Sequence, residues 1–150
     1  MDTINSNELV EVTLRQGDQH LGTLFKGDIL FLKSGMRQSV DDAVKDEIEE
    51  IKRLDRKPQS KIVVIVETTG GYVETVERIV SVFRQHYKTV EYVIPNHAYS
   101  AGTVLVMSGD EIHMDYYSIL GPIDPQLPVD GTYMPGMGYL AKCLSKNEKG

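Results

Sequence analysis

The sequence predicts an α/β domain with a largely parallel sheet, and two observations support that prediction. The run KIVVIVE (61–67) is continuously β-branched and lacks polar alternation, which is typical of a strand covered on both faces. Segments with helical spacing stand between this run and later strand candidates, so the order is strand, helix, strand, helix, strand. That order favours right-handed crossovers between parallel strands. At 150 residues the chain is long enough for one domain with a buried core.

The first half of the chain contains one strand candidate and one clear helix before the KIVVIVE run. The first thirty residues have little pattern except DILFL (28–32), which ends at the turn signal KSG. The segment 39–54 predicts a helix that Ser39 can cap, with Asp42 near the positive end of the helix dipole. Its apolar residues form a single stripe at helical spacing: Val40, Val44, Ile48 and Ile51.

The second half repeats the alternation of strands and helices. The strand 61–67 ends in TTGGY, and the helical pattern VETVERIVSVFRQHY (73–87) follows. A second buried strand, TVEYVI (89–94), leads to PNHAYSAGT and to an apolar helical pattern after Ser100. EIHMDYY (111–117) is a third strand candidate, and residues 118–138 are a loop rich in glycine and proline.

Composition excludes several classes of function. The net charge is −6 and no cluster of lysine and arginine is present, so we expect no nucleic-acid partner. Cys143 is the only cysteine, so an internal disulfide is impossible and a reducing compartment fits. No run of about 18 apolar residues exists, and MDTINSNELV lacks the features of a signal peptide. We therefore expect a cytoplasmic protein, with no indication of membrane association.

Two loops follow consecutive strands and could build one site, because ligands gather beyond the carboxyl ends of parallel strands. Gly70 and Gly71 lack a Cβ and can adopt backbone angles that direct N–H groups into a cleft. Ser100 precedes a helix, and the amide of Ala101 lies at the start of that helix. A nucleophilic serine with two oxyanion donors is one interpretation of this pattern. An ordinary capping serine beside a tight turn is the other.

Three segments together resemble a known family of enzymes. VIVETTGGYVETVERIV, VIPNHAYSAGTVLVMSGDEIHMD and SILGPIDPQL are similar to the serine dehydrogenase proteinase group, relatives of signal peptide peptidase A with the Clp/crotonase fold. The resemblance covers about 28–127 and implies stacked ββα units in a spiral. It implies that Ser100 is the nucleophile, with Gly70 or Gly71 and the Ala101 amide as oxyanion donors. It also implies a peptide or protein substrate, a homo-oligomer and no cofactor.

The resemblance offers two patterns for the general base of such an enzyme. Clp-type peptidases place a histidine near the position of ILGPID, where this chain has Gly121 and Pro122. Relatives of signal peptide peptidase A use a lysine several tens of residues after the serine, and Lys142 in MGYLAKCLSK is the candidate. A lysine acts as a base only when it is neutral, which requires burial or nearby positive charge.

Other interpretations remain open at this stage. A metal site from His97, His113 and Asp110 has no supporting ligand spacing, and we expect no metal. No GxxxxGK sequence is present, so any dependence on ATP would need a separate partner. The alternatives to a peptidase are an assembly or binding module of the same fold and crotonase-like chemistry on an acyl thioester. We expect one domain of this fold over 1–150, and either it is truncated at its C-terminus or its site is incomplete.

Overall fold

The computed structural model describes residues 6–54, 59–124, 126–129 and 132–135, with side chains over 10–54 and 59–124. The helices are α1 (Ser6–Phe25), α2 (Val40–Leu54), α3 (Val73–His86) and α4 (Ala101–Met107). The strands are β1 (Asp28–Lys33), β2 (Lys61–Glu67), β3 (Thr89–Ile94), β4 (His97–Ala98), β5 (Glu111–Met114), β6 (Ile119–Leu120), β7 (Gln126–Val129) and β8 (Thr132–Pro135). The expected α/β class and its largely parallel sheet are confirmed.

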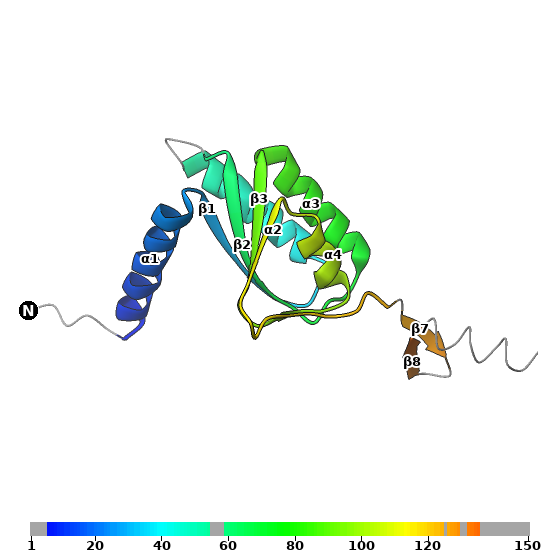
Figure 1. Cartoon of the computed structure of the whole chain (residues 1–150). Coiled ribbons are helices and arrows are strands. Elements are labelled where there is room, and N and C mark those ends of the chain that lie inside the picture. The colour runs from blue at the N-terminus through cyan, green and yellow to red at the C-terminus, as the bar shows by residue number, and fades with distance from the viewer. Residues whose placement is uncertain (1–5, 55–58, 125, 130–131, 136–150) are drawn as a thin grey trace, which may run out of the picture.

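The main sheet has four parallel strands in the order β1-β2-β3-β5. Helices α2 and α3 lie side by side on one face, and α4 packs beyond α3 (Figure 1). Alternate strand residues point to that face and form the core with the apolar stripes of the helices. The predicted stripe of α2 is confirmed, because Val44 and Ile48 are buried and Val40 and Ile51 pack against the core.

A second set of short parallel pairings follows the ends of the main strands. Met36 pairs with Gly71, and Thr68 pairs with Ala98. Ala98 pairs in turn with Leu120, through the short strands β4 and β6. Each long strand is thus followed by a short pairing, which is the repeated ββα unit that the resemblance implied. These pairings join the connections that follow the strands, where the expected site lies.

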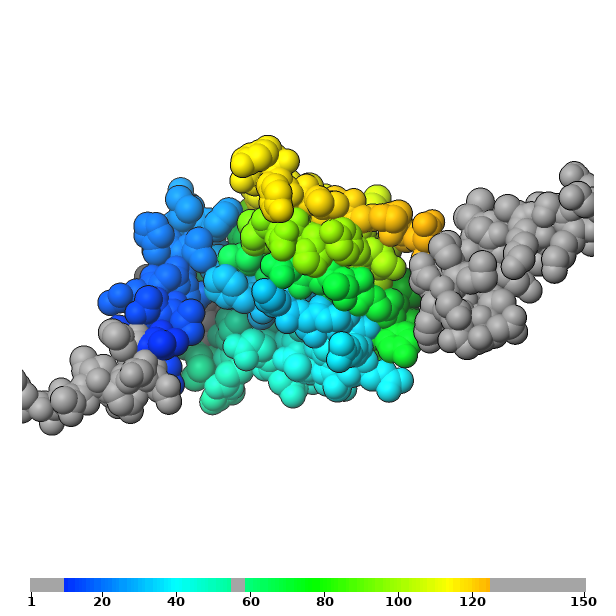
Figure 2. All heavy atoms as spheres, turned by 90° about the horizontal axis from the view of Figure 1, so that it is seen from below, coloured from blue at the N-terminus to red at the C-terminus, as the bar shows by residue number. Residues whose placement is uncertain are grey.

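Helix α1 corrects the prediction that the first thirty residues hold little besides a strand. A stretch without apolar residues, RQGDQH (15–20), interrupts its pattern, which explains why no helical periodicity was recognised. Several of its apolar residues are also exposed: Val10, Val12, Leu14 and Leu24. Figure 2 shows α1 at one end of the molecule. A cavity of about 960 Å³ lies between α1, β1 and the start of α2. Among the described residues, no helix combines the length and apolarity needed to cross a membrane.

The loop predicted over 118–138 is also partly wrong. It contains β6 and an antiparallel hairpin of β7 and β8, in which Val129 pairs with Thr132. The Asp130-Gly131 dipeptide between these two strands is a hairpin signal that the neighbouring prolines obscured.

Candidate active site

Ser100 has a backbone conformation that serine rarely adopts. It stands at the N-cap of α4 with φ 52° and ψ −121°. Positive φ is unfavourable for a residue with a Cβ, and such conformations concentrate at functional sites. The Ser100 carbonyl accepts the N–H groups of Thr103 and Val104, but its hydroxyl makes no capping hydrogen bond. The interpretation of Ser100 as an ordinary capping serine is therefore not supported, since its side-chain oxygen does not cap the helix and has no hydrogen-bond partner among the described residues.

The glycine loop lies directly against Ser100. Gly70 has φ +90°, and a Cβ placed on it would lie 2.5 Å from the Tyr99 carbonyl oxygen and 2.9 Å from the Ser100 Cβ. The same Cβ would lie 3.2 Å from the Ala101 nitrogen. Only a residue without a side chain permits this approach. The structure thus brings Gly70, Ser100 and Ala101 together from loops that follow consecutive strands.

The two glycines use their backbone groups differently. The Gly70 N–H donates to the Thr68 hydroxyl oxygen at 3.1 Å, and the Gly70 carbonyl accepts the Met36 N–H at 2.8 Å. In a trans peptide the carbonyl and the next N–H point in opposite directions. The Gly71 N–H therefore points away from Met36. Within the described part of the chain, neither the Gly71 nor the Ala101 N–H has an acceptor.

Thr68 connects the two loops, and the sequence analysis assigned it no role. Its backbone N–H donates to the His97 carbonyl at 3.1 Å, and its carbonyl accepts the Tyr99 N–H at 3.0 Å. Its methyl group lies where a Cβ on Gly102 would be, so position 102 requires glycine. A signal for Thr68 exists in the sequence, because a threonine hydroxyl commonly accepts the amide two residues later.

Thr103 is a second residue that the sequence analysis missed. Its hydroxyl is buried and lies 2.9 Å from both the Ala98 and the Gly121 carbonyl oxygens. It therefore ties α4 to β4 and to the segment after β6. Gly121 itself packs on the Tyr99 ring so closely that a Cβ there would overlap it.

The aromatic residues before Ser100 form a stacked pair. The rings of His97 and Tyr99 have centroids 4.6 Å apart and an interplanar angle of 17°. Nearby, the Glu67 carboxylate lies 3.1 Å from Lys33 Nζ. A hydrogen bond from Lys33 lowers the pKa of Glu67, and the positive charge of a protonated His97 would lower it further. Lys142, the predicted base, lies outside the described residues.

The three residues considered for a metal site are held in separate interactions. Asp110 accepts Arg84 Nη1 and the Val90 N–H, each at 2.7 Å, while His97 stacks on Tyr99. His113 lies on β5, and its Nε2 is 3.2 Å from a Glu91 carboxylate oxygen. His113 points to the sheet face opposite that of its neighbours Ile112 and Met114, because it shares that face with Glu91.

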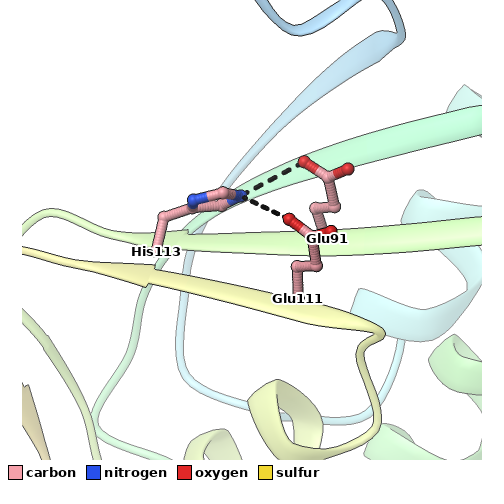
Figure 3. Close-up of side chains that lie close together, drawn as sticks. All are labelled: Glu91, Glu111 and His113. Atoms are coloured by element: carbon pink, nitrogen blue, oxygen red, sulfur yellow. Dashed lines mark hydrogen bonds and ion pairs between the residues drawn. The ribbon is translucent and has the colours of Figure 1, made fainter.

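A different group, which we call the Glu91 cluster, brings possible metal ligands together: Glu91, Glu111 and His113 (Figure 3). Their ligand atoms lie within 4.8 Å of one another, on the sheet face opposite α2 and α3. Glu91 is buried, which raises its pKa, but hydrogen bonds from Lys61 and His113 lower that pKa by more. The Lys61 ammonium at 2.9 Å already neutralises the Glu91 carboxylate, so the group is an ion-pair cluster.

Two cavities in the described part of the chain lie elsewhere. The larger is beside α1, and the other, of about 460 Å³, is lined by residues of the α2 and α3 N-termini and of the segments before them. Neither is lined by Ser100. Ser100 itself is half-buried in the described part of the single chain.

Comparisons with known proteins identify relatives of this chain. Residues 38–148 match the family model of the ClpP-like SDH-type serine proteinases. Two uncharacterized proteins of Methanocaldococcus jannaschii are 33% and 34% identical over 85 residues. These matches cover 56% and 57% of this chain but only 30% and 28% of those proteins.

Solved structures show the same fold. A serine-to-alanine variant of the 1510-N membrane-bound stomatin-specific protease has a TM-score of 0.61 at 17% identity, covering 77% of this chain and 57% of that one. A lysine-to-alanine variant of that protease, in complex with a substrate peptide, has a TM-score of 0.60 at 19% identity, covering 77% and 54%. The ClpP catalytic domain of Plasmodium falciparum has a TM-score of 0.51 at 14% identity, covering 73% and 53%.

Proposed function

Because the chain belongs to the family of ClpP-like SDH-type serine proteinases, we propose that it is a serine peptidase whose nucleophile is Ser100. One observation carries the proposal: a strained serine with an uncommitted hydroxyl lies beside two backbone N–H groups that have no acceptor in the described part of the chain. Acyl transfer needs a nucleophile and preorganised donors at one carbon atom. The arrangement around Ser100 offers both from backbone geometry.

The reaction would proceed through an acyl-enzyme. Ser100 Oγ attacks the peptide carbonyl while a base removes the hydroxyl proton, and the carbonyl oxygen becomes an oxyanion. The N–H groups of Gly71 and Ala101 donate to that oxyanion. The intermediate then expels the amine, which takes the proton from the base, and the Ser100 ester remains. Water attacks the ester with the same base and releases the free acid and Ser100.

The two glycines receive different roles in this proposal. The Gly70 N–H is committed to Thr68, so Gly71 is the more suitable oxyanion donor of the two. Gly70 instead permits the close approach of the glycine loop to Ser100. The Ala101 amide has the added support of the α4 dipole, which favours negative charge at the helix start.

A neutral lysine, Lys142, is the proposed base. Its sequence neighbours Leu140, Ala141, Cys143 and Leu144 are of the kind that lower a lysine pKa by burial. The solved relative with a lysine replaced by alanine is in complex with a substrate peptide, which is the outcome expected when a base is removed and binding persists. We extend the proposal to a homo-oligomer, because Ser100 is only half-buried in the described part of the single chain.

Labelling with a fluorophosphonate probe tests the nucleophile. The hydroxyl displaces fluoride from phosphorus, so a reactive serine forms a stable bond. We expect wild type to be labelled, Ser100→Ala to be unlabelled, and Ser39→Ala to be labelled as wild type. Ser39 is the matched control, because it also precedes a helix with positive φ. Absence of labelling in every oligomeric state would favour a non-catalytic binding module.

The base is tested separately. Lys142→Ala is expected to abolish labelling near neutral pH and to retain it at alkaline pH, where hydroxide replaces the base. Lys146→Ala is the control from the same segment and should behave as wild type. Equal pH profiles for wild type and Lys142→Ala would assign the base to another residue and leave Ser100 in place.

A further inference from the structure

We infer that Thr68 is the positioning residue that fixes the glycine loop against the serine turn, an inference that rests on the function proposed above. Thr68 is buried and follows the last residue of β2. Thr68 does not supply either proposed oxyanion donor, and none of its described hydrogen bonds involves the Ser100 hydroxyl. Its interactions nevertheless reach both loops, which makes it the link between them.

The backbone of Thr68 holds the serine loop. Its N–H and carbonyl bond to His97 and Tyr99 at 3.1 and 3.0 Å, which is the parallel pairing of Thr68 with Ala98. Ser100 is the next residue after Tyr99. The start of the turn that carries the hydroxyl is thereby fixed to the end of β2.

The hydroxyl and the methyl group of the Thr68 side chain contact different loops. The hydroxyl oxygen accepts the Gly70 N–H at 3.1 Å, while the methyl group packs on Gly102 in the first turn of α4. Serine would offer only the hydroxyl at this position, and valine would offer only the methyl groups. Threonine is the residue that supplies both contacts in one side chain.

The hydroxyl contact supports the direction of the Gly71 N–H by holding the peptide plane that precedes Gly70, while the Met36 bond holds the plane that follows it. With the Gly70 N–H on Thr68 and the Gly70 carbonyl on Met36, both peptide planes of Gly70 are fixed. Without the Thr68 acceptor only the Met36 bond holds Gly70, whose backbone has little intrinsic preference, so the loop gains freedom to rotate. A rotated loop would turn the Gly71 amide away from the developing oxyanion, where donor geometry matters most.

Two substitutions separate the hydroxyl from the methyl group. Thr68→Val keeps the shape and removes the acceptor, and we expect it to slow the maximal rate of fluorophosphonate labelling about 10- to 100-fold, without weakening the initial binding of the probe. Thr68→Ser keeps the acceptor and should label within about threefold of wild type. Thr75→Val is the control, because it removes another buried threonine hydroxyl and should label at the wild-type rate.

Thermal unfolding distinguishes positioning from general stability. Thr68→Ser loses a packed methyl group and is expected to have the lower Tm, although it labels faster than Thr68→Val. If the variant with the lower Tm were also the one that labels more slowly, Thr68 would have only a structural role. Rapid labelling of Thr68→Val would also overturn the inference.

Amide hydrogen exchange measured by NMR provides a readout that does not depend on activity. The Gly70 amide should exchange faster in Thr68→Val than in wild type or Thr68→Ser, since only valine removes its acceptor. If wild type fails to react with the probe, the proposed function fails, and this exchange alone decides the role of Thr68. Equal exchange of the Gly70 amide in all three proteins would refute that role.

Discussion

The turn at Ser100 and the Glu91 cluster are built in opposite ways. The cluster holds two carboxylates, an imidazole and the Lys61 ammonium, and every one of these groups has an ionisable partner within 4 Å. The turn holds one hydroxyl and two amides, and no partner for them is present in the described residues. Ionisable side chains alone would therefore point to the wrong place.

The difference shows where each region is stabilised. In the Glu91 cluster the partners compensate the burial of Glu91, so the groups are satisfied without a ligand. At the serine turn, the backbone holds Ser100 in an unfavourable conformation and leaves donors unused. A site that is incomplete without a substrate is the one expected to bind it. The predictions below test this contrast.

Gly70→Ala is expected to have the largest effect on the serine turn. The new Cβ would meet the Tyr99 carbonyl and Ser100 at positive φ, so the loops must separate. We expect a loss of about 2–4 kcal/mol in the free energy of unfolding. Labelling of Ser100 should fall by at least about 100-fold, because a small displacement of the donors is sufficient. Denaturant unfolding and probe labelling measure the two effects.

Gly17→Ala is the matched control for that substitution. Gly17 lies in α1 and a Cβ on it would have no neighbour within 4 Å. Alanine there should stabilise the protein by up to about 1 kcal/mol through helix propensity and leave labelling unchanged. Wild-type labelling of Gly70→Ala would show that the glycine loop does not contribute to the site.

Glu91→Gln should give the opposite result at the Glu91 cluster. The neutral amide leaves Lys61 without its charged partner, and we expect a loss of about 2 kcal/mol in the free energy of unfolding. Labelling of Ser100 should remain within about twofold, because Glu91 is the third residue of β3 and Ser100 lies beyond the opposite end of that strand. The control Glu111→Gln alters an exposed carboxylate and should cost less than about 0.5 kcal/mol.

The sequence predicted the parts of the fold whose signal is local. The predictions were correct for the strands 61–67 and 89–94 and for the helix that contains Val44 and Ile48. Burial of these elements requires the residue patterns that identify them. Helix α1 was missed, since the polar stretch 15–20 interrupts its apolar residues and many of them remain exposed. Its position depends on contacts that no local pattern encodes.

The candidate site shows the same division between local and non-local information. Ser100, Gly70 and Ala101 were identified from small residues at turns, and the structure brings them together. Thr68 was overlooked because its importance arises from contacts to Gly102 and Tyr99, more than 30 positions away in the chain. The choice between Gly70 and Gly71 needed the direction of one peptide plane, which a sequence does not reveal.

The pH dependence of stability provides a smaller test of the Glu91 cluster. The pKa of Glu91 is lowered from 4.5 in the folded protein, so its stabilising contribution is present above pH 4.5 and is lost as the pH falls through the folded pKa. Wild type should therefore exceed Glu91→Gln in stability at neutral pH, and the difference should shrink below about pH 4.5. Denaturant unfolding from pH 7 to pH 3 measures it. A constant difference would mean that the Glu91 charge is not what stabilises the cluster.

The smallest change in the free energy of unfolding is expected where serine is replaced by glycine before a helix. Ser100→Gly removes the positive-φ strain and should raise the free energy of unfolding by about 1 kcal/mol while abolishing labelling. Ser39→Gly, at φ 73°, should raise it by about 0.5 kcal/mol and leave labelling intact. Both serines have positive φ, so that feature alone does not identify a nucleophile; the neighbouring amides support the proposed one. If Ser100→Gly proved less stable than wild type, the serine side chain would be stabilising its turn, and the contrast with the Glu91 cluster would disappear.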